Sequence, residues 1–66
     1  MVYILLGEGF EEAEALVPAD LLRRSGVEVA LVGLEGHQVT GGHGITVQAD
    51  LLLEEADPDR MEMLVL

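Results

Sequence analysis

The fold is decided by residues 1–34, which read MVYILLGEGFEEAEALVPADLLRRSGVEVALVGL. The apolar run Val2–Leu6 is rich in strand-forming residues and is typical of a strand buried on both faces of a parallel sheet. A Gly-x-Gly turn follows, and Phe10–Ser25 is predicted to be a helix that Gly26 closes at its C-terminus. Val27–Leu34 is predicted to be a second buried strand. Strand, helix and strand in this order predict a right-handed β-α-β unit.

The remaining residues follow a different pattern. Gly36–Thr40 and Ile45–Gln48 alternate between apolar and polar residues around a glycine-rich loop, which indicates a β-hairpin or a pair of short strands. Leu51–Glu55 is predicted to be a short helical turn and Asp57–Asp59 another turn. Met61–Leu66 is predicted to be a further buried strand. One long helix would leave one face of this sheet bare, so we expect the N-terminal part of a larger α/β domain.

Composition limits the function. The chain has 66 residues, enough for one small domain at most. Three arginines and no lysine stand against 13 acidic residues, which gives a net charge of −10. Nucleic acids and anionic membranes need basic residues to neutralise their phosphates, so neither is an expected partner. The absence of cysteine excludes a disulfide framework and a cysteine-based zinc site.

No apolar run approaches the roughly 20 residues needed to span a bilayer. The N-terminus also lacks the basic segment that precedes the apolar run of a secretory signal. A soluble, cytoplasmic protein is therefore expected.

The Gly-x-Gly turn does not complete a dinucleotide-binding motif. That motif requires a third glycine where this chain has Glu12. Glu11 and Glu14 add further negative charge at the helix N-terminus, where a pyrophosphate would bind. No cofactor is expected.

The predicted helix is apolar on two sides, which indicates a cover on both. One side comprises Phe10, Ala13, Leu16, Val17 and Leu21, and the other comprises Ala15, Pro18, Ala19 and Leu22.

Glu14 is the candidate site residue, at the edge of the first of these sides. Pro18 has no N–H group, so the carbonyl of Glu14 loses its helical donor and the helix should kink there. A half-buried carboxylate beside such an irregularity suggests a working site. The alternative is a solvated glutamate stabilised by the helix dipole, which is the better interpretation of Glu11 and Glu12.

The two histidines do not indicate a metal site. His37 and His43 lie in predicted loops without a cysteine or a helical partner nearby. Structural or solvent-facing roles are favoured for both.

Three segments resemble a known family: GFEEAEALVPADLLRRSGVEVALVGL, then VTGGHGITVQADLLLEE, then a final LVL. They are similar to the N-terminal third of the ThiJ/PfpI family. The greatest similarity is to its subfamily of parkinsonism-associated deglycases and glyoxalases, also known as 4-methyl-5-(beta-hydroxyethyl)thiazole monophosphate biosynthesis proteins. Residues 1–66 would then be the N-terminal part of a single, incomplete domain of this type.

The resemblance implies a flavodoxin-like three-layer α/β sandwich, of which this chain holds the β-α-β unit and hairpin, and usually a homodimer. It also implies a site in which a cysteine thiolate attacks a small carbonyl substrate such as methylglyoxal, or an early glycation adduct. By motif position, Glu14 is the glutamate whose protonated carboxyl would hydrogen-bond that thiolate. The thiolate is the reactive form of cysteine.

This chain departs from the family pattern because it contains neither the cysteine nor the family's catalytic histidine. Alone it should therefore be inactive, and the remaining C-terminal portion of the domain becomes an expected partner. Two other functions on the same fold stay open: a redox-sensing stress chaperone without enzymatic activity, and an intracellular cysteine peptidase or amidase.

Overall fold

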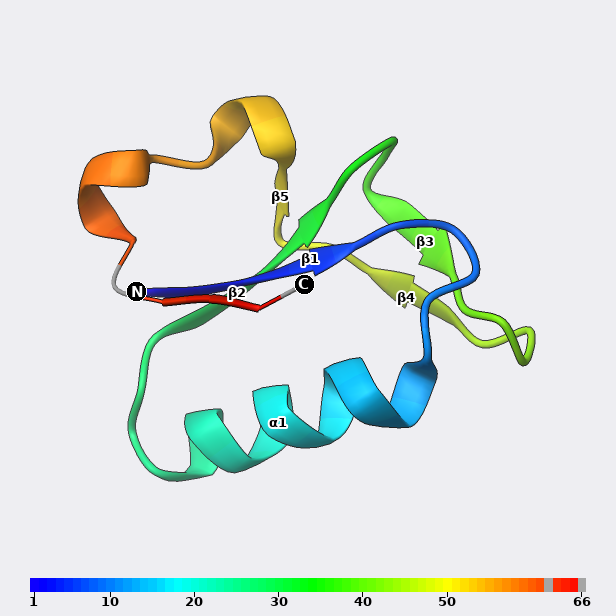
Figure 1. Cartoon of the computed structure of the whole chain (residues 1–66), viewed down its shortest axis with the longest axis horizontal. Helices are drawn as coiled ribbons and strands as arrows, with labels where there is room; N and C mark the ends of the chain where they lie inside the picture. The colour runs from blue at the N-terminus through cyan, green and yellow to red at the C-terminus, as the bar shows by residue number, and fades with distance from the viewer. Residues whose placement is uncertain (62, 66) are drawn as a thin grey trace.

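A computed structural model describes residues 1–61 and 63–65. Its elements are β1 (Val2–Leu6), α1 (Glu12–Arg24), β2 (Val29–Gly33), β3 (Gln38–Thr40), β4 (Thr46–Gln48), β5 (Leu51–Leu52), two 3₁₀ turns (Leu53–Glu55 and Pro58–Arg60) and β6 (Met63–Val65). The main sheet has the order β5-β2-β1-β6 and is parallel throughout (Figure 1). The predicted β-α-β unit is confirmed, and β3 and β4 form the predicted hairpin as a separate antiparallel pair.

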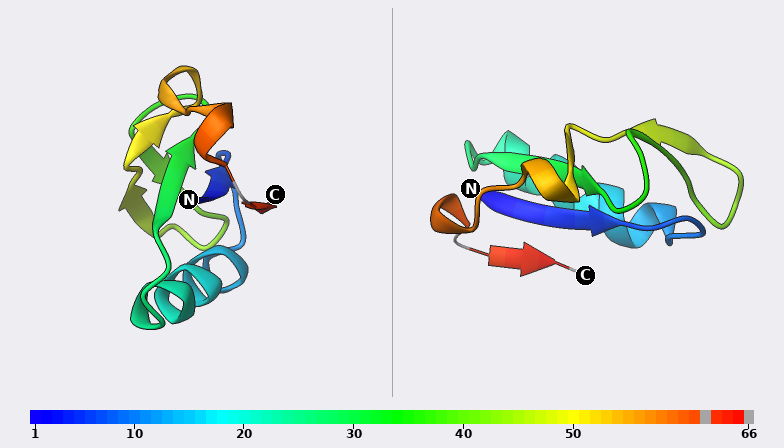
Figure 2. Two further views of the ribbon diagram at one scale, coloured as in Figure 1. Left: turned by 90° about the vertical axis from the view of Figure 1, so that its left-hand side faces the viewer. Right: turned by 90° about the horizontal axis from the view of Figure 1, so that it is seen from above.

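The alternation of side chains along β1 divides the core into two layers. Val2, Ile4 and Leu6 face α1 and the hairpin, where Ala19 and Val39 are also buried. On the other face, Tyr3 packs with Ala30 and Val32. The helix lies on one side of the sheet and the 3₁₀ turns on the other (Figure 2).

The hydroxyl of Tyr3 ties the turns to the sheet. It accepts a hydrogen bond from the Asp57 N–H at 2.9 Å and donates one to the Asp57 carbonyl at 3.1 Å.

The C-terminus of α1 forms as the sequence predicts. Gly26 has a φ of +86°, a left-handed conformation that glycine adopts without strain. The N–H of Gly26 donates to the Arg23 carbonyl, and the N–H of Val27 donates to the Leu22 carbonyl. These two bonds define a Schellman motif, which satisfies the last carbonyls of the helix.

Some predicted boundaries were wrong. The helix begins at Glu12 instead of Phe10, because the Phe10 carbonyl accepts a hydrogen bond from the hairpin and Glu11 is extended. The strand predicted at Val27–Leu34 is shortened to Val29–Gly33, since Val27 belongs to the helix cap.

Leu51–Leu52 is a short strand and not part of a helical turn, because it pairs with the end of β2. Within the predicted strand Met61–Leu66, β6 occupies Met63–Val65, while positions 62 and 66 lie outside the described residues. Leu64 is 46% exposed, so the burial predicted for this strand does not hold for it.

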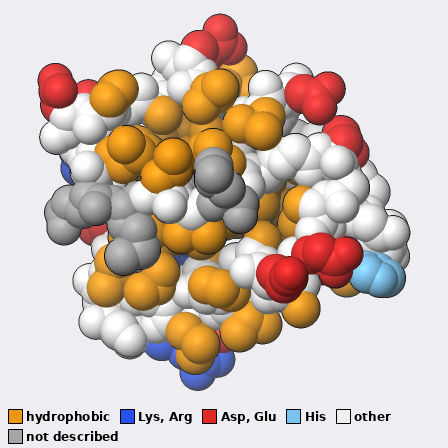
Figure 3. Space-filling view, in the orientation of Figure 1, with side chains coloured by type: hydrophobic (Ala, Val, Ile, Leu, Met, Phe, Trp, Pro, Cys, Tyr) orange, Lys and Arg blue, Asp and Glu red, His pale blue; other side chains and the backbone are white. Residues whose placement is uncertain are grey.

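The two apolar sides of the helix have different surroundings. Ala15, Ala19 and Leu22 pack against the sheet, and Leu16 from the other predicted side joins them. Val17 and Leu21 are 53% and 58% exposed. Figure 3 shows hydrophobic side chains gathered over the middle of one face of the molecule, with acidic side chains around them.

The helix continues through Pro18 as one element, and the kink predicted there stays a prediction. Asp20 and Arg24, one helical turn apart, form an ion pair, with both carboxylate oxygens 3.1 Å from the guanidinium Nε. Within the described part of the chain, no helix is long and apolar enough to cross a membrane. A cytoplasmic location stays a prediction.

Candidate functional site

The strand order places a natural binding position beside β1. The chain passes from β1 through α1 to β2 on one side, whereas β6 pairs with the opposite side of β1. The direction in which strands are added therefore reverses at β1. In open α/β sheets, ligands bind at such a reversal, outside the carboxyl ends of the strands.

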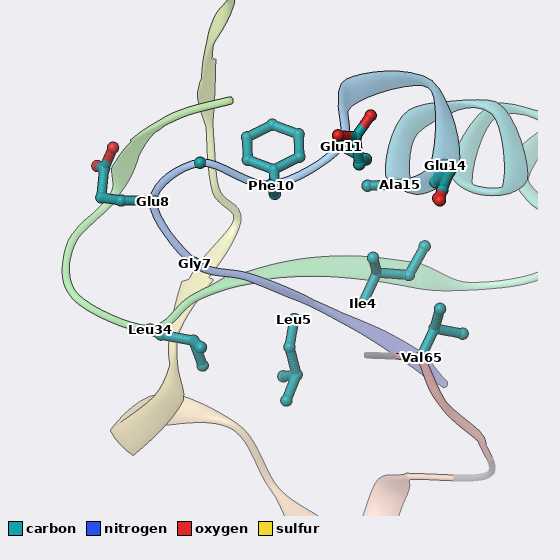
Figure 4. A pocket seen from close by; sticks show the side chains of 11 residues that line it. Ile4, Leu5, Gly7, Glu8, Phe10, Glu11, Glu14, Ala15, Leu34 and Val65 are labelled. Atoms are coloured by element: carbon teal, nitrogen blue, oxygen red, sulfur yellow. The ribbon is translucent and has the colours of Figure 1, made fainter. Parts of the chain in front are cut away.

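A pocket of about 430 Å³ lies at this position. Its lining combines apolar sheet residues, the turn after β1 and the first turn of α1: Ile4, Leu5, Gly7, Glu8, Gly9, Phe10, Glu11, Glu14, Ala15, Leu34 and Val65. In Figure 4, Glu14 and Ala15 lie on the helix opposite Ile4 and Val65 of the sheet, and Glu8 lies at the far end. Three carboxylates and no basic side chain line the described part of this pocket.

Glu14 lies in the pocket, as a site residue should, but its side chain is exposed. The prediction of a half-buried carboxylate was therefore wrong for this chain. Glu14 is at the edge of the helix side that carries Val17 and Leu21, and both of these side chains are more than half exposed.

Glu12 was interpreted wrongly from the sequence as a solvated glutamate. It is 6% exposed and is the one buried charged residue among those described. Its Oε2 accepts the backbone N–H of His43 at 2.8 Å and that of Ile45 at 3.3 Å. Its Oε1 lies 2.9 Å from Nδ1 of the His43 ring. The carboxylate is therefore a fixed acceptor for the loop between β3 and β4.

The charge on Glu12 is strongly favoured. Burial acts to raise its pKa, but hydrogen bonds from the His43 ring and from backbone N–H groups outweigh it, and the pKa falls from 4.5 to about 2. The pKa of His43 is raised, first by its hydrogen bond to Glu12 and then by the charges of Glu12 and Glu11. Opposite charges thus hold each other in the ionised state.

The loop after β3 also binds the turn that forms the pocket. The Gly9 N–H donates to the Thr40 carbonyl, and the Gly42 N–H donates to the Phe10 carbonyl, each at 2.8 Å. A Cβ at Gly41 would collide with the Glu12 carboxylate, so this position requires glycine for close packing. The hairpin therefore braces the β1–α1 turn.

The structural role favoured for His43 is confirmed by its bond to Glu12. Nε2 of His37 lies 3.5 Å from Glu55 at the molecular surface. In the described ranges, no group of three or more His, Cys, Asp or Glu side chains is arranged to hold a metal ion.

The Glu12–His43 pair predicts a pH optimum of stability. Glu12 stabilises the fold above its unfolded pKa of 4.5, and this contribution is lost as pH falls toward 2. His43 stabilises the fold below 6.5, and its contribution is lost as pH rises through its raised pKa. Thermal unfolding of the complete domain should therefore occur a few degrees higher at pH 5.5 than at pH 8.5, because of this pair.

A His43→Gln variant should lose that part of the difference, whereas His37→Gln should keep it. An equal effect of both variants would contradict the assignment to the pair.

The comparisons with known proteins agree with this geometry. The model of the DJ-1/PfpI family matches residues 1–66. The chain belongs to the DJ-1/PfpI family. The predicted resemblance is thereby confirmed.

Several relatives are named deglycases. The chain is 40% identical over 65 residues to Deglycase TK1284 of Thermococcus kodakarensis, which covers 98% of this chain and 39% of that protein. It is 35% identical to Deglycase PfpI of Pyrococcus furiosus, with the same coverage. This chain thus spans about two fifths of the length of these relatives.

Solved structures confirm the flavodoxin-like α/β fold class. A mutant of the DJ-1 superfamily protein STM1931 from Salmonella typhimurium superposes with a TM-score of 0.92 at 39% identity, covering 98% of this chain and 36% of that one. Oxidized DJ-1 of Toxoplasma gondii gives a TM-score of 0.89 at 28% identity, covering 96% and 35%.

Proposed function

We propose that this chain supplies the N-terminal part of a deglycase-type domain that acts on small reactive carbonyls or early glycation adducts. The observation that carries the proposal is that Glu14 lines the pocket where the direction of strand addition reverses. Family membership over residues 1–66 and relatives named deglycases support it. The remaining portion of the domain would supply the cysteine and the histidine.

In this proposal Glu14 supports the nucleophile. The thiolate sulfur forms a bond to the aldehyde carbon of methylglyoxal, and the electron pair of the C=O π bond moves to the oxygen. This oxygen takes up, through water, the proton that the thiol lost on ionisation, which gives a hemithioacetal. Before this step, the thiolate and Glu14 would repel each other if both were charged. In the role that the family resemblance gives it, a protonated Glu14 carboxyl avoids this repulsion and donates a hydrogen bond to the sulfur.

The test uses the complete domain, meaning this chain joined to the remaining portion that its relatives carry. It should consume methylglyoxal and release it from adducts on free amines, and prior alkylation of its cysteine should abolish both reactions. Residues 1–66 alone, which contain no cysteine, serve as the inactive control. Full activity after alkylation would contradict a cysteine-dependent mechanism.

The homodimer implied by the family resemblance stays a prediction. The exposed side chains of Val17 and Leu21 on α1 offer an apolar surface for a second subunit or for the remaining portion of the domain. The chaperone and peptidase functions also stay predictions.

A further inference from the structure

We propose that Glu12 is a positioning residue: it fastens the β3–β4 hairpin to the β1–α1 turn and thereby fixes Glu14 in the pocket. This inference rests on the proposed function, because the consequence concerns the reaction that Glu14 supports. It deepens that function by assigning a role to a side chain outside the pocket lining.

The first support is how completely Glu12 is committed to the hairpin. Its carboxylate is buried and accepts two backbone N–H groups, from His43 and Ile45, in addition to its contact with the His43 ring. An unpaired buried carboxylate is costly, so loss of the loop contacts would be strongly disfavoured. Three contacts of the loop thus converge on this one side chain.

The second support is that the end of β3 and the loop after it also bind the turn between β1 and α1, which lines the pocket. Gly9 and Phe10 line the pocket, and both have backbone hydrogen bonds to the hairpin, at Thr40 and Gly42. The Thr40 N–H also lies 3.3 Å from the carboxylate of Glu8. The hairpin therefore binds the chain both before α1, at Gly9 and Phe10, and at the first residue of α1, Glu12.

The third support is the position of Glu14 on the helix. Glu12 and Glu14 are two residues apart, so their side chains leave α1 in different directions. The Glu12 carboxylate bonds to the hairpin. Glu14 lines the pocket (Figure 4). When Glu12 holds the first turn of α1 in place, the backbone of Glu14 is held as well. The Glu12 side chain itself stays outside the pocket where the substrate would bind.

The variants separate the contributions of Glu12. Glu12→Ala removes every acceptor. Glu12→Gln keeps one oxygen for the two backbone N–H groups, and its NH₂ group can donate to neutral Nδ1 of His43. We expect Glu12→Ala to lower kcat of the complete domain about 10- to 100-fold, with a smaller change in KM, because misplaced reacting groups lose rate steeply with distance. Glu12→Gln should retain most of the kcat that Glu12→Ala loses.

Hydrogen exchange tests the clamp independently of activity. In Glu12→Ala, the amides of Gly9, Gly42, His43 and Ile45 should exchange about tenfold faster or more, since their hydrogen bonds join the hairpin to the turn or to Glu12. Amides of β1 should be unchanged. Glu54→Gln, which removes an exposed charge outside this pocket, should alter neither exchange nor kcat.

A double-mutant cycle with Glu14→Ala decides whether Glu12 acts through Glu14. The loss caused by Glu12→Ala should largely disappear when Glu14 is already alanine. Equal losses in both backgrounds, or unchanged exchange in the loop, would overturn the inference while leaving the proposed function intact. A harmless Glu14→Ala would overturn the role proposed for Glu14 in the reaction, and this inference with it. If Glu12→Ala does not fold, His43→Ala replaces it, because that change removes only the ring contact.

Discussion

Replacing Glu14 by alanine in the complete domain should lower kcat/KM for methylglyoxal by about 100-fold or more. This magnitude is typical for loss of a side chain that supplies or holds a proton beside a reacting group. The physical reason is that alanine cannot hydrogen-bond the thiolate, so the fraction of cysteine in its reactive form should fall. Glu14→Gln should lose less, since its amide N–H can still donate a hydrogen bond.

The rate of cysteine alkylation, measured as a function of pH, reports the thiolate directly. In Glu14→Ala, alkylation should require a higher pH than in the parent protein. Glu54→Ala is the matched control because Glu54 is exposed and lies outside this pocket. A Glu14→Ala protein that is folded and retains full turnover would show that the carboxyl has no part in the reaction.

Those elements of the fold could be predicted whose sequence patterns, such as an apolar run or a glycine after a helix, lie within the element itself. The apolar run Val2–Leu6 forms a buried strand, and the glycine after the helix adopts the positive φ that ends it. The boundaries at Phe10 and Leu51 could not be predicted, because they depend on hydrogen bonds to residues far away in the chain. Such tertiary partners leave no periodicity in the sequence.

The candidate site shows the same division. Glu14 could be proposed from the helix pattern and the family motif, and the structure places it in the pocket. Glu12 was missed because a glutamate in the first turn is ordinarily solvated and stabilised by the helix dipole. Its partners, His43 and Ile45, are more than 30 residues away. The glycines beside His43 were the available signal, since one of them, Gly41, leaves the space that Glu12 fills.

Replacing Gly33 by alanine should destabilise the complete domain by about 3 kcal/mol or more, at or beyond the upper end of ordinary overpacking. Gly33 ends β2 and is buried between Leu6 of β1 and Leu52 of β5. An added Cβ would collide with the backbone carbonyl oxygen of Gly36 and lie 3.3 Å from the Cβ of Ala49. A backbone atom cannot rotate away as a side chain can. Relief would require moving either the end of β2, which is paired on both sides, or the backbone of the turn at Gly36.

Gly36→Ala is the matched control, because a Cβ at Gly36 meets no atom within 4 Å. Its effect on the free energy of unfolding should stay within about 0.5 kcal/mol. Urea unfolding of both variants measures the difference, and equal midpoints would show that the turn after β2 adapts freely. The result also bears on the site, since Leu34 follows Gly33 directly and lines the pocket. A displaced β2 end would therefore lower activity along with stability, whereas Gly36→Ala should lower neither.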